Sequence, residues 1–91
     1  MKPEVRILVS ACGRSVCAGF IVRGESVDGM VSGSTCSSLC GEVMDKGYWG
    51  ELRYAVGDCT CGLPVLDRQP SSVDRWLSIS HKIVKIIEYN L

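Results

Sequence analysis

Cysteine is the residue type in this chain whose number and spacing point to chemistry. Six of the 91 residues are cysteines, and they fall into three short-range pairs: Cys12 with Cys17, Cys36 with Cys40, and Cys59 with Cys61. Cysteine thiolates bind soft metals, cysteine thiols oxidise to disulfides, and buried cysteines also serve as small apolar core residues.

The two cysteines of each pair are expected to lie close together, for a different local reason in each case. Cys36 and Cys40 are four residues apart in a predicted helix, so both side chains lie on one helix face. The pair at 59 and 61 points to one side of an extended segment, and the pair at 12 and 17 flanks a short loop. Because the two cysteines of each pair already lie close together, less conformational entropy is lost when four of them bind one metal site. We therefore expect four of the six cysteines to bind zinc or an iron–sulfur cluster, in a structural, metal-handling or electron-transfer role.

The spacing of the cysteines does not match one known type of metal site. The C-x₃-C pair fits the range of zinc knuckles, whereas C-x-C is tighter than usual. The chain has neither a C-x-x-C redox motif nor a ferredoxin pattern. The alternative is an interaction module without metal, whose cysteines are buried or joined in structural disulfides.

Other catalytic motifs are absent from the sequence. The single histidine, His81, lies between two apolar segments and is more typical of a boundary residue than of a catalytic base. The acidic residues form no carboxylate pair, and the glycines match no phosphate-binding loop. We expect a protein that is not an enzyme, although a single activated cysteine beside His81 stays open as a third possibility.

Composition restricts the class of partner. Ten Lys and Arg balance ten Asp and Glu, so the chain lacks the positive surplus of a nucleic-acid-binding domain. No apolar run approaches the roughly 18 residues of a membrane span. The stretch from Ile7 to Val9 is too short for an export signal, so we expect a cytoplasmic protein with reduced thiols. A protein partner or a homo-oligomer is compatible with this composition.

The patterning predicts one α+β domain over residues 1–91. Alternating apolar residues predict strands at 4–10, 18–23 and 26–32, which form an antiparallel three-strand meander. An apolar stripe predicts a helix over 36–44, with Ser34 as N-cap and Gly47 at its C-terminal end. Residues 48–56 fit either a helix or a strand, and the helix is favoured. Residues 57–64 are predicted to form a loop.

The C-terminal region has two interpretations. A helix is predicted over 72–80, and Val84, Ile87 and Leu91 would continue its stripe. The segment is also rich in β-branched residues, including Ile83 and Ile86, which favour a strand. We predict a strand over 83–89 that completes the sheet, with the longer helix as the alternative.

Three short motifs carry a family resemblance. The run Cys17-Ala18-Gly19-Phe20, then Cys36, then residues 59–65 (Cys-Thr-Cys-Gly-Leu-Pro-Val) resemble small cysteine-containing proteins of anaerobic bacteria and methanogenic archaea whose chemistry is unassigned. In that family a Cys-Gly-Phe motif ends a strand; here Ala18 interrupts it. The resemblance implies an α+β fold in an anaerobic cytoplasm. It also implies a ligand set of Cys17, Cys36, Cys59 and Cys61, with Cys12 and Cys40 as substitutes.

Overall fold

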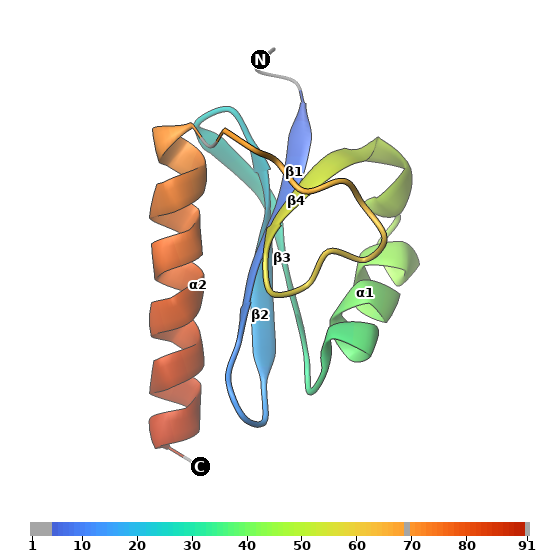
Figure 1. The fold of residues 1–91 in the computed structure, drawn as a ribbon. Coiled ribbons are helices and arrows are strands. Elements are labelled where there is room, and N and C mark those ends of the chain that lie inside the picture. Colours follow the sequence, from blue (N-terminus) through green and yellow to red (C-terminus); the bar gives the residue numbers. More distant parts are fainter. Residues whose placement is uncertain (1–4, 69, 91) are drawn as a thin grey trace.

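A four-stranded sheet lies between two helices in the computed structural model, which describes residues 5–68 and 70–90 (Figure 1). In chain order the elements are β1 (Arg6–Cys12), β2 (Cys17–Arg23), β3 (Ser26–Gly33), α1 (Cys36–Asp45), the short 3₁₀ helix η1 (Trp49–Glu51), β4 (Leu52–Gly57) and α2 (Ser71–Tyr89). The strand order is β3-β2-β1-β4. The predicted α+β class is therefore confirmed.

The first three strands pair as consecutive antiparallel neighbours. Between β1 and β2 the register runs from Arg6 opposite Arg23 to Cys12 opposite Cys17. Both strands are buried on both faces, which explains why they read as nearly continuous apolar runs. Glu4, the predicted start of the first strand, lies outside the described residues.

The prediction of a helix over 48–56 is wrong. This segment begins with η1 and continues as β4, which pairs parallel to β1 at the edge of the sheet. The register between β1 and β4 shifts between Arg6 and Ile7. Because of this irregularity, the buried residues Leu52, Ala55 and Val56 are spaced as in a helix although the chain is extended.

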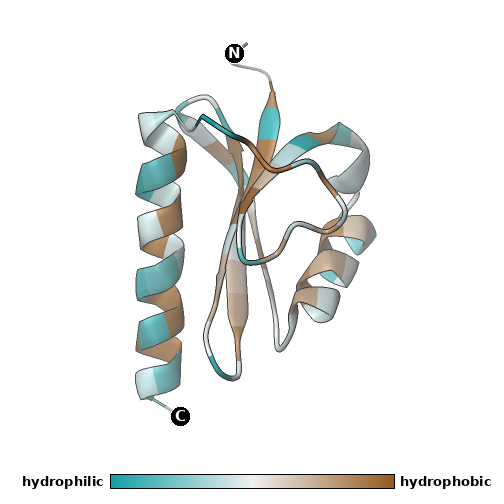
Figure 2. Ribbon diagram, in the orientation of Figure 1, coloured by the Kyte–Doolittle hydropathy of each residue, from teal (hydrophilic) through white to brown (hydrophobic). Residues whose placement is uncertain are grey.

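The predicted C-terminal strand over 83–89 is also wrong, because α2 runs without interruption to Tyr89. The fourth strand of the sheet is β4, so the description of a meander completed by a C-terminal strand does not hold. Val73, Ser80 and Val84 are buried along one side of α2, and Figure 2 shows apolar residues on the side of α2 that faces the sheet. Burial of this stripe outweighs the β propensity of the isoleucines.

The predicted helix at 36–44 is confirmed as α1, with one difference at its start. Its N-cap is Thr35 and not Ser34: the Thr35 hydroxyl accepts a hydrogen bond from the Ser38 N–H at 3.1 Å. This cap fixes Cys36 as the first residue of the helix.

The sheet separates two apolar cores. On the α2 face, Phe20 packs against Trp76 with ring centroids 4.8 Å apart, inside a cluster with Ile7, Val9 and Val73. On the α1 face a second cluster is built around buried aliphatic residues, namely Leu8, Ile21, Val31, Leu39, Val43 and Leu52. All six cysteines belong to, or pack against, this second cluster. Within the described residues, no helix has the length and apolar character to cross a membrane.

Candidate cysteine site

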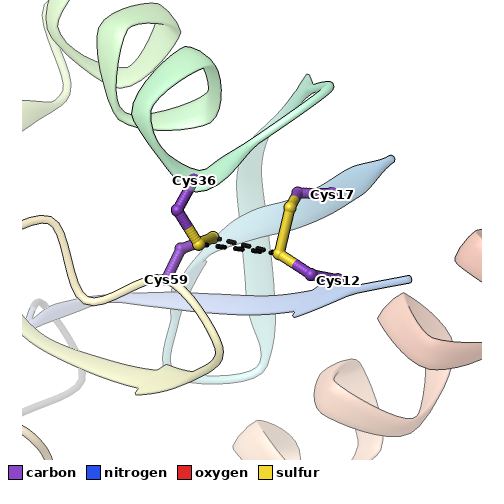
Figure 3. Close-up of side chains that lie close together, drawn as sticks. All are labelled: Cys12, Cys17, Cys36 and Cys59. Carbon is purple, nitrogen blue, oxygen red and sulfur yellow. Dashed lines mark hydrogen bonds between the residues drawn. A yellow bond between two sulfur atoms is a disulfide. The ribbon is translucent and has the colours of Figure 1, made fainter. Parts of the chain in front are cut away.

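Three elements and one loop bring four of the six cysteines together at one end of the sheet (Figure 3). Cys12 ends β1 and Cys17 begins β2, directly opposite each other in the register and joined by a disulfide across a Cα–Cα distance of 4.1 Å. Cys36, the first residue of α1, is joined to Cys59 in the loop after β4, with Cα atoms 5.3 Å apart. These two disulfides lie against each other.

The four sulfurs of these two disulfides form a tight group. All four Sγ atoms lie within 4.8 Å of one another, a spacing at which four thiolates could hold one metal ion. The Sγ of Cys12 is 3.4 Å from that of Cys59 and 3.6 Å from that of Cys36. Cys17 and Cys59 are buried, whereas Cys12 and Cys36 are half-buried. One side of the group is therefore open to solvent.

A third disulfide joins Cys40 to Cys61, with Cα atoms 5.5 Å apart. The two helical cysteines thus bond across to the two loop cysteines and not to each other, so two parallel cross-links tie α1 to the loop. The four-sulfur group holds Cys12 in the place that the family resemblance gives to Cys61. The identity of any metal ligands stays a prediction.

Backbone contacts hold the loop cysteines beside β1. The buried Ser10 hydroxyl accepts a hydrogen bond from the Cys59 N–H at 2.9 Å and donates one to the Cys59 carbonyl at 3.2 Å. The Asp58 carboxylate accepts a hydrogen bond from the Cys12 N–H at 2.7 Å. Sequence reasoning missed Ser10, and the available signal was a small polar residue inside an apolar strand.

A tight turn presents Cys61. The Leu63 N–H donates to the Thr60 carbonyl at 2.8 Å, and the two central residues, Cys61 and Gly62, have φ values of 53° and 82°. Two positive φ values define a type I′ turn, in which glycine is favoured and a cysteine is unusual. Among the described non-glycine residues, Cys61 is the one with positive φ, so the chain accepts an unfavourable backbone conformation at a cross-linked position.

His81 and the ion pairs of Asp28 lie away from this site. His81 is exposed on α2, on the opposite face of the sheet, so the structure does not bring it to the cysteines. At the far end of β1, Asp28 binds Arg23 and Arg6, and these two guanidinium groups, with Arg23 the stronger influence, lower the pKa of its carboxyl group.

The chain was also compared with known proteins. It matches no protein-family model, no curated protein and no solved structure. The family resemblance in the three cysteine motifs therefore stays a hypothesis.

Proposed function

We propose that the protein is a small interaction module that is not an enzyme, and that its six cysteines are structural disulfides. The observation that carries this proposal is that every cysteine has a bonding partner and that two of the three cross-links join α1 to the loop after β4. Such cross-links stabilise a small domain chiefly by restricting its unfolded chain. They also add covalent links to a loop that hydrogen bonds already hold beside β1 and β4.

The surface beside this loop is suited to a protein partner. Trp49, in η1, keeps 36% of its surface exposed and lies close to the turn at Gly62, where an added Cβ atom would come within 3.8 Å of the indole ring. Tryptophan is enriched among the residues that dominate binding energy at interfaces. Trp49 lies beside a loop that disulfides hold in place, which lowers the entropic cost of ordering this surface on binding.

Mass spectrometry tests the structural role of the cysteines. Protein from cells quenched with an alkylating agent should remain unmodified and six hydrogens lighter than the reduced chain, and peptide mapping should recover the links 12–17, 36–59 and 40–61. Alkylation of all six thiols in freshly lysed cells would contradict the proposal.

Affinity capture tests the binding role. Immobilised oxidised protein should retain a partner that the Trp49→Ala variant does not retain, because the variant keeps the fold and loses the exposed ring. Retention of the same partner by both proteins would move the binding surface away from Trp49.

A second candidate function is thiolate binding of zinc or an iron–sulfur cluster, favoured by the group of four sulfurs within 4.8 Å. Elemental analysis and visible absorption of anaerobically purified protein test it. Less than about a tenth of an equivalent of zinc or iron per chain would remove metal binding as a resting property of the protein.

A further inference from the structure

We propose that Cys12, Cys17, Cys36 and Cys59 form a redox-gated zinc site: two disulfides close it in the oxidised chain, and reduction opens it to one zinc ion. This proposal rests on the second candidate function and specifies its ligands, its metal and its control. Cys40 and Cys61 are not ligands in this site.

The geometry favours a single tetrahedral ion. A tetrahedron with metal–sulfur bonds of about 2.3 Å places its sulfurs about 3.8 Å apart. The contacts between the two disulfides, 3.4 Å and 3.6 Å, are already close to that spacing, and all four sulfurs lie within 4.8 Å of one another. Each bonded pair has to open by about 1.7 Å from the ordinary disulfide length, a movement of the size that rotation about one side-chain bond produces.

The same spacing disfavours an iron–sulfur cluster. Such a cluster places several iron and sulfide atoms between its thiolates and spreads them further than a single ion does. Among single ions, four thiolates in tetrahedral geometry are typical of zinc. The site therefore fits a single zinc ion in its size and in its sulfur donors.

The surroundings support four thiolates at this place. Cys36 is the first residue of α1, where the helix dipole favours a negative charge. Cys59 is held by two hydrogen bonds to Ser10, and the Cys12 backbone is held by Asp58, so the ligand positions persist when the disulfides open. Cys17 and Cys12 stay opposite each other through strand pairing.

The reaction balances with a dithiol as reductant. Its thiolate attacks the half-buried Cys12 sulfur and displaces the Cys17 thiolate, and its second thiol then releases Cys12 and leaves as a cyclic disulfide. The Cys12 thiolate lies 3.4 Å from the Cys59 sulfur, so it can attack that sulfur, form a Cys12–Cys59 disulfide and displace the Cys36 thiolate. A second dithiol then reduces the Cys12–Cys59 bond in the same way. Two dithiols yield four cysteine thiols, and one Zn²⁺ then displaces four protons.

Two double variants with four cysteines each provide the test. C40S/C61S keeps the proposed ligands and loses the third disulfide, whereas C12S/C17S keeps the third disulfide and loses half of the ligands. Each protein is reduced anaerobically, freed of reductant and titrated with Zn²⁺ against a chelating dye. Co²⁺ serves as a second probe, through its thiolate charge-transfer and tetrahedral d–d bands.

The expected result is one zinc per chain for the reduced wild type and for C40S/C61S, with at least 100-fold weaker binding for C12S/C17S. Oxidised wild type should bind no zinc until a dithiol is added. Circular dichroism of the oxidised variants checks that both fold. Equal binding by the two variants, binding by oxidised protein, or no zinc on the reduced wild type would overturn the proposal. The last outcome would leave the three mapped disulfides, and with them the interaction module, untouched.

Discussion

At the scale of single residues, the cysteine site depends on how closely β4 approaches β1. Gly57 ends β4 with a φ of 103°, and a Cβ atom added there would collide with the Ser10 carbonyl oxygen. Only glycine allows both this conformation and this approach. The next two residues, Asp58 and Cys59, make the contacts to β1 that place the Cys59 sulfur. Gly57, which has no side chain, thus sets the position of the reactive Cys59 sulfur.

We therefore expect Gly57→Ala to lower the free energy of unfolding by about 3 kcal/mol, because it combines an unfavourable φ with a backbone collision. Urea denaturation of the oxidised protein measures this change. The matched control is Gly41→Ala: Gly41 lies inside α1 with nothing within 4 Å of an added Cβ atom, so the control should gain about 0.5–1 kcal/mol. An equal effect at the two positions would contradict the argument.

A second residue-scale prediction concerns Asp28, which links β3 to Arg23 and Arg6. Since these ion pairs lower the pKa of the Asp28 carboxyl group below its ordinary value near 3.8, the unfolded chain binds a proton there more readily than the folded chain. The stabilisation is therefore complete above that ordinary value and is lost as the pH falls through the lowered pKa.

Asp28→Asn tests this linkage. At neutral pH the variant should be less stable by about 1 kcal/mol, as expected for a small, partly exposed ion-pair network. The difference between wild type and variant should shrink as the pH is lowered from 6 to 2, and thermal unfolding across that range measures it. A constant difference at every pH would show that Asp28 acts through packing and not through charge.

At the scale of elements, α1 is held to the loop after β4 by two disulfides that share the same pair of segments. When Cys36 and Cys59 are already bonded, the bond between Cys40 and Cys61 closes only a small covalent ring, made of residues 36–40 and 59–61. When Cys36 and Cys59 are not bonded, it closes a loop with a sequence separation of 21. The entropy that each bond removes from the unfolded chain therefore depends on the other bond.

We predict that the losses of unfolding free energy caused by removing these two disulfides are not additive. By chain-entropy arithmetic, C36S/C59S and C40S/C61S should each cost about 2.5 kcal/mol, and the quadruple variant about 6 kcal/mol. Urea denaturation, with the same concentration of sucrose in every sample, completes the double-mutant cycle. Strictly additive losses would show that the two bonds act independently, through native contacts rather than through the unfolded chain.

These elements also show how far the sequence could predict the structure. The strands at 18–23 and 26–32 and the helix at 36–44 were predictable, because local periodicity and tertiary burial agree there. Residues 52–56 were not, because an irregular parallel edge strand spaces its buried residues as a helix does. The helix over residues 83–89 could not be predicted. The β-branched residues there favour a strand, and the surface that buries the apolar stripe of the helix, the face of β1 and β2, lies far away in the sequence.

The pairing of the cysteines could not be predicted from the sequence. Local spacing suggested that Cys36 and Cys40 act together, and they do face the same loop. Their bonds run to Cys59 and Cys61, however, because the crossing of the loop over α1 is a tertiary feature that spacing does not encode. Grouping Cys12 and Cys17 with Cys36 and Cys59 likewise depends on the pairing of β1 with β4.

At the scale of the whole molecule, the two faces of the sheet are stabilised by different means. The α2 face relies on the longest helix of the described chain and on apolar contacts such as Phe20 with Trp76. The α1 face has a ten-residue helix and all three disulfides. Loss of the cross-links therefore acts on one layer, while the core on the other side keeps its contacts.

We therefore predict that reduction in the presence of a chelator loosens the molecule from the α1 side. Amide hydrogen exchange should accelerate at least about tenfold in α1 and in residues 58–63, and much less in α2 and in the β1–β2 ladder, because local opening follows the loss of local constraints. Adding zinc to the reduced protein should restore protection at 58–63 if the four thiolates bind the ion. Uniform acceleration across both faces would mean that the sheet and its two layers unfold as one unit. The two cores would then not be stabilised independently, which would contradict the prediction.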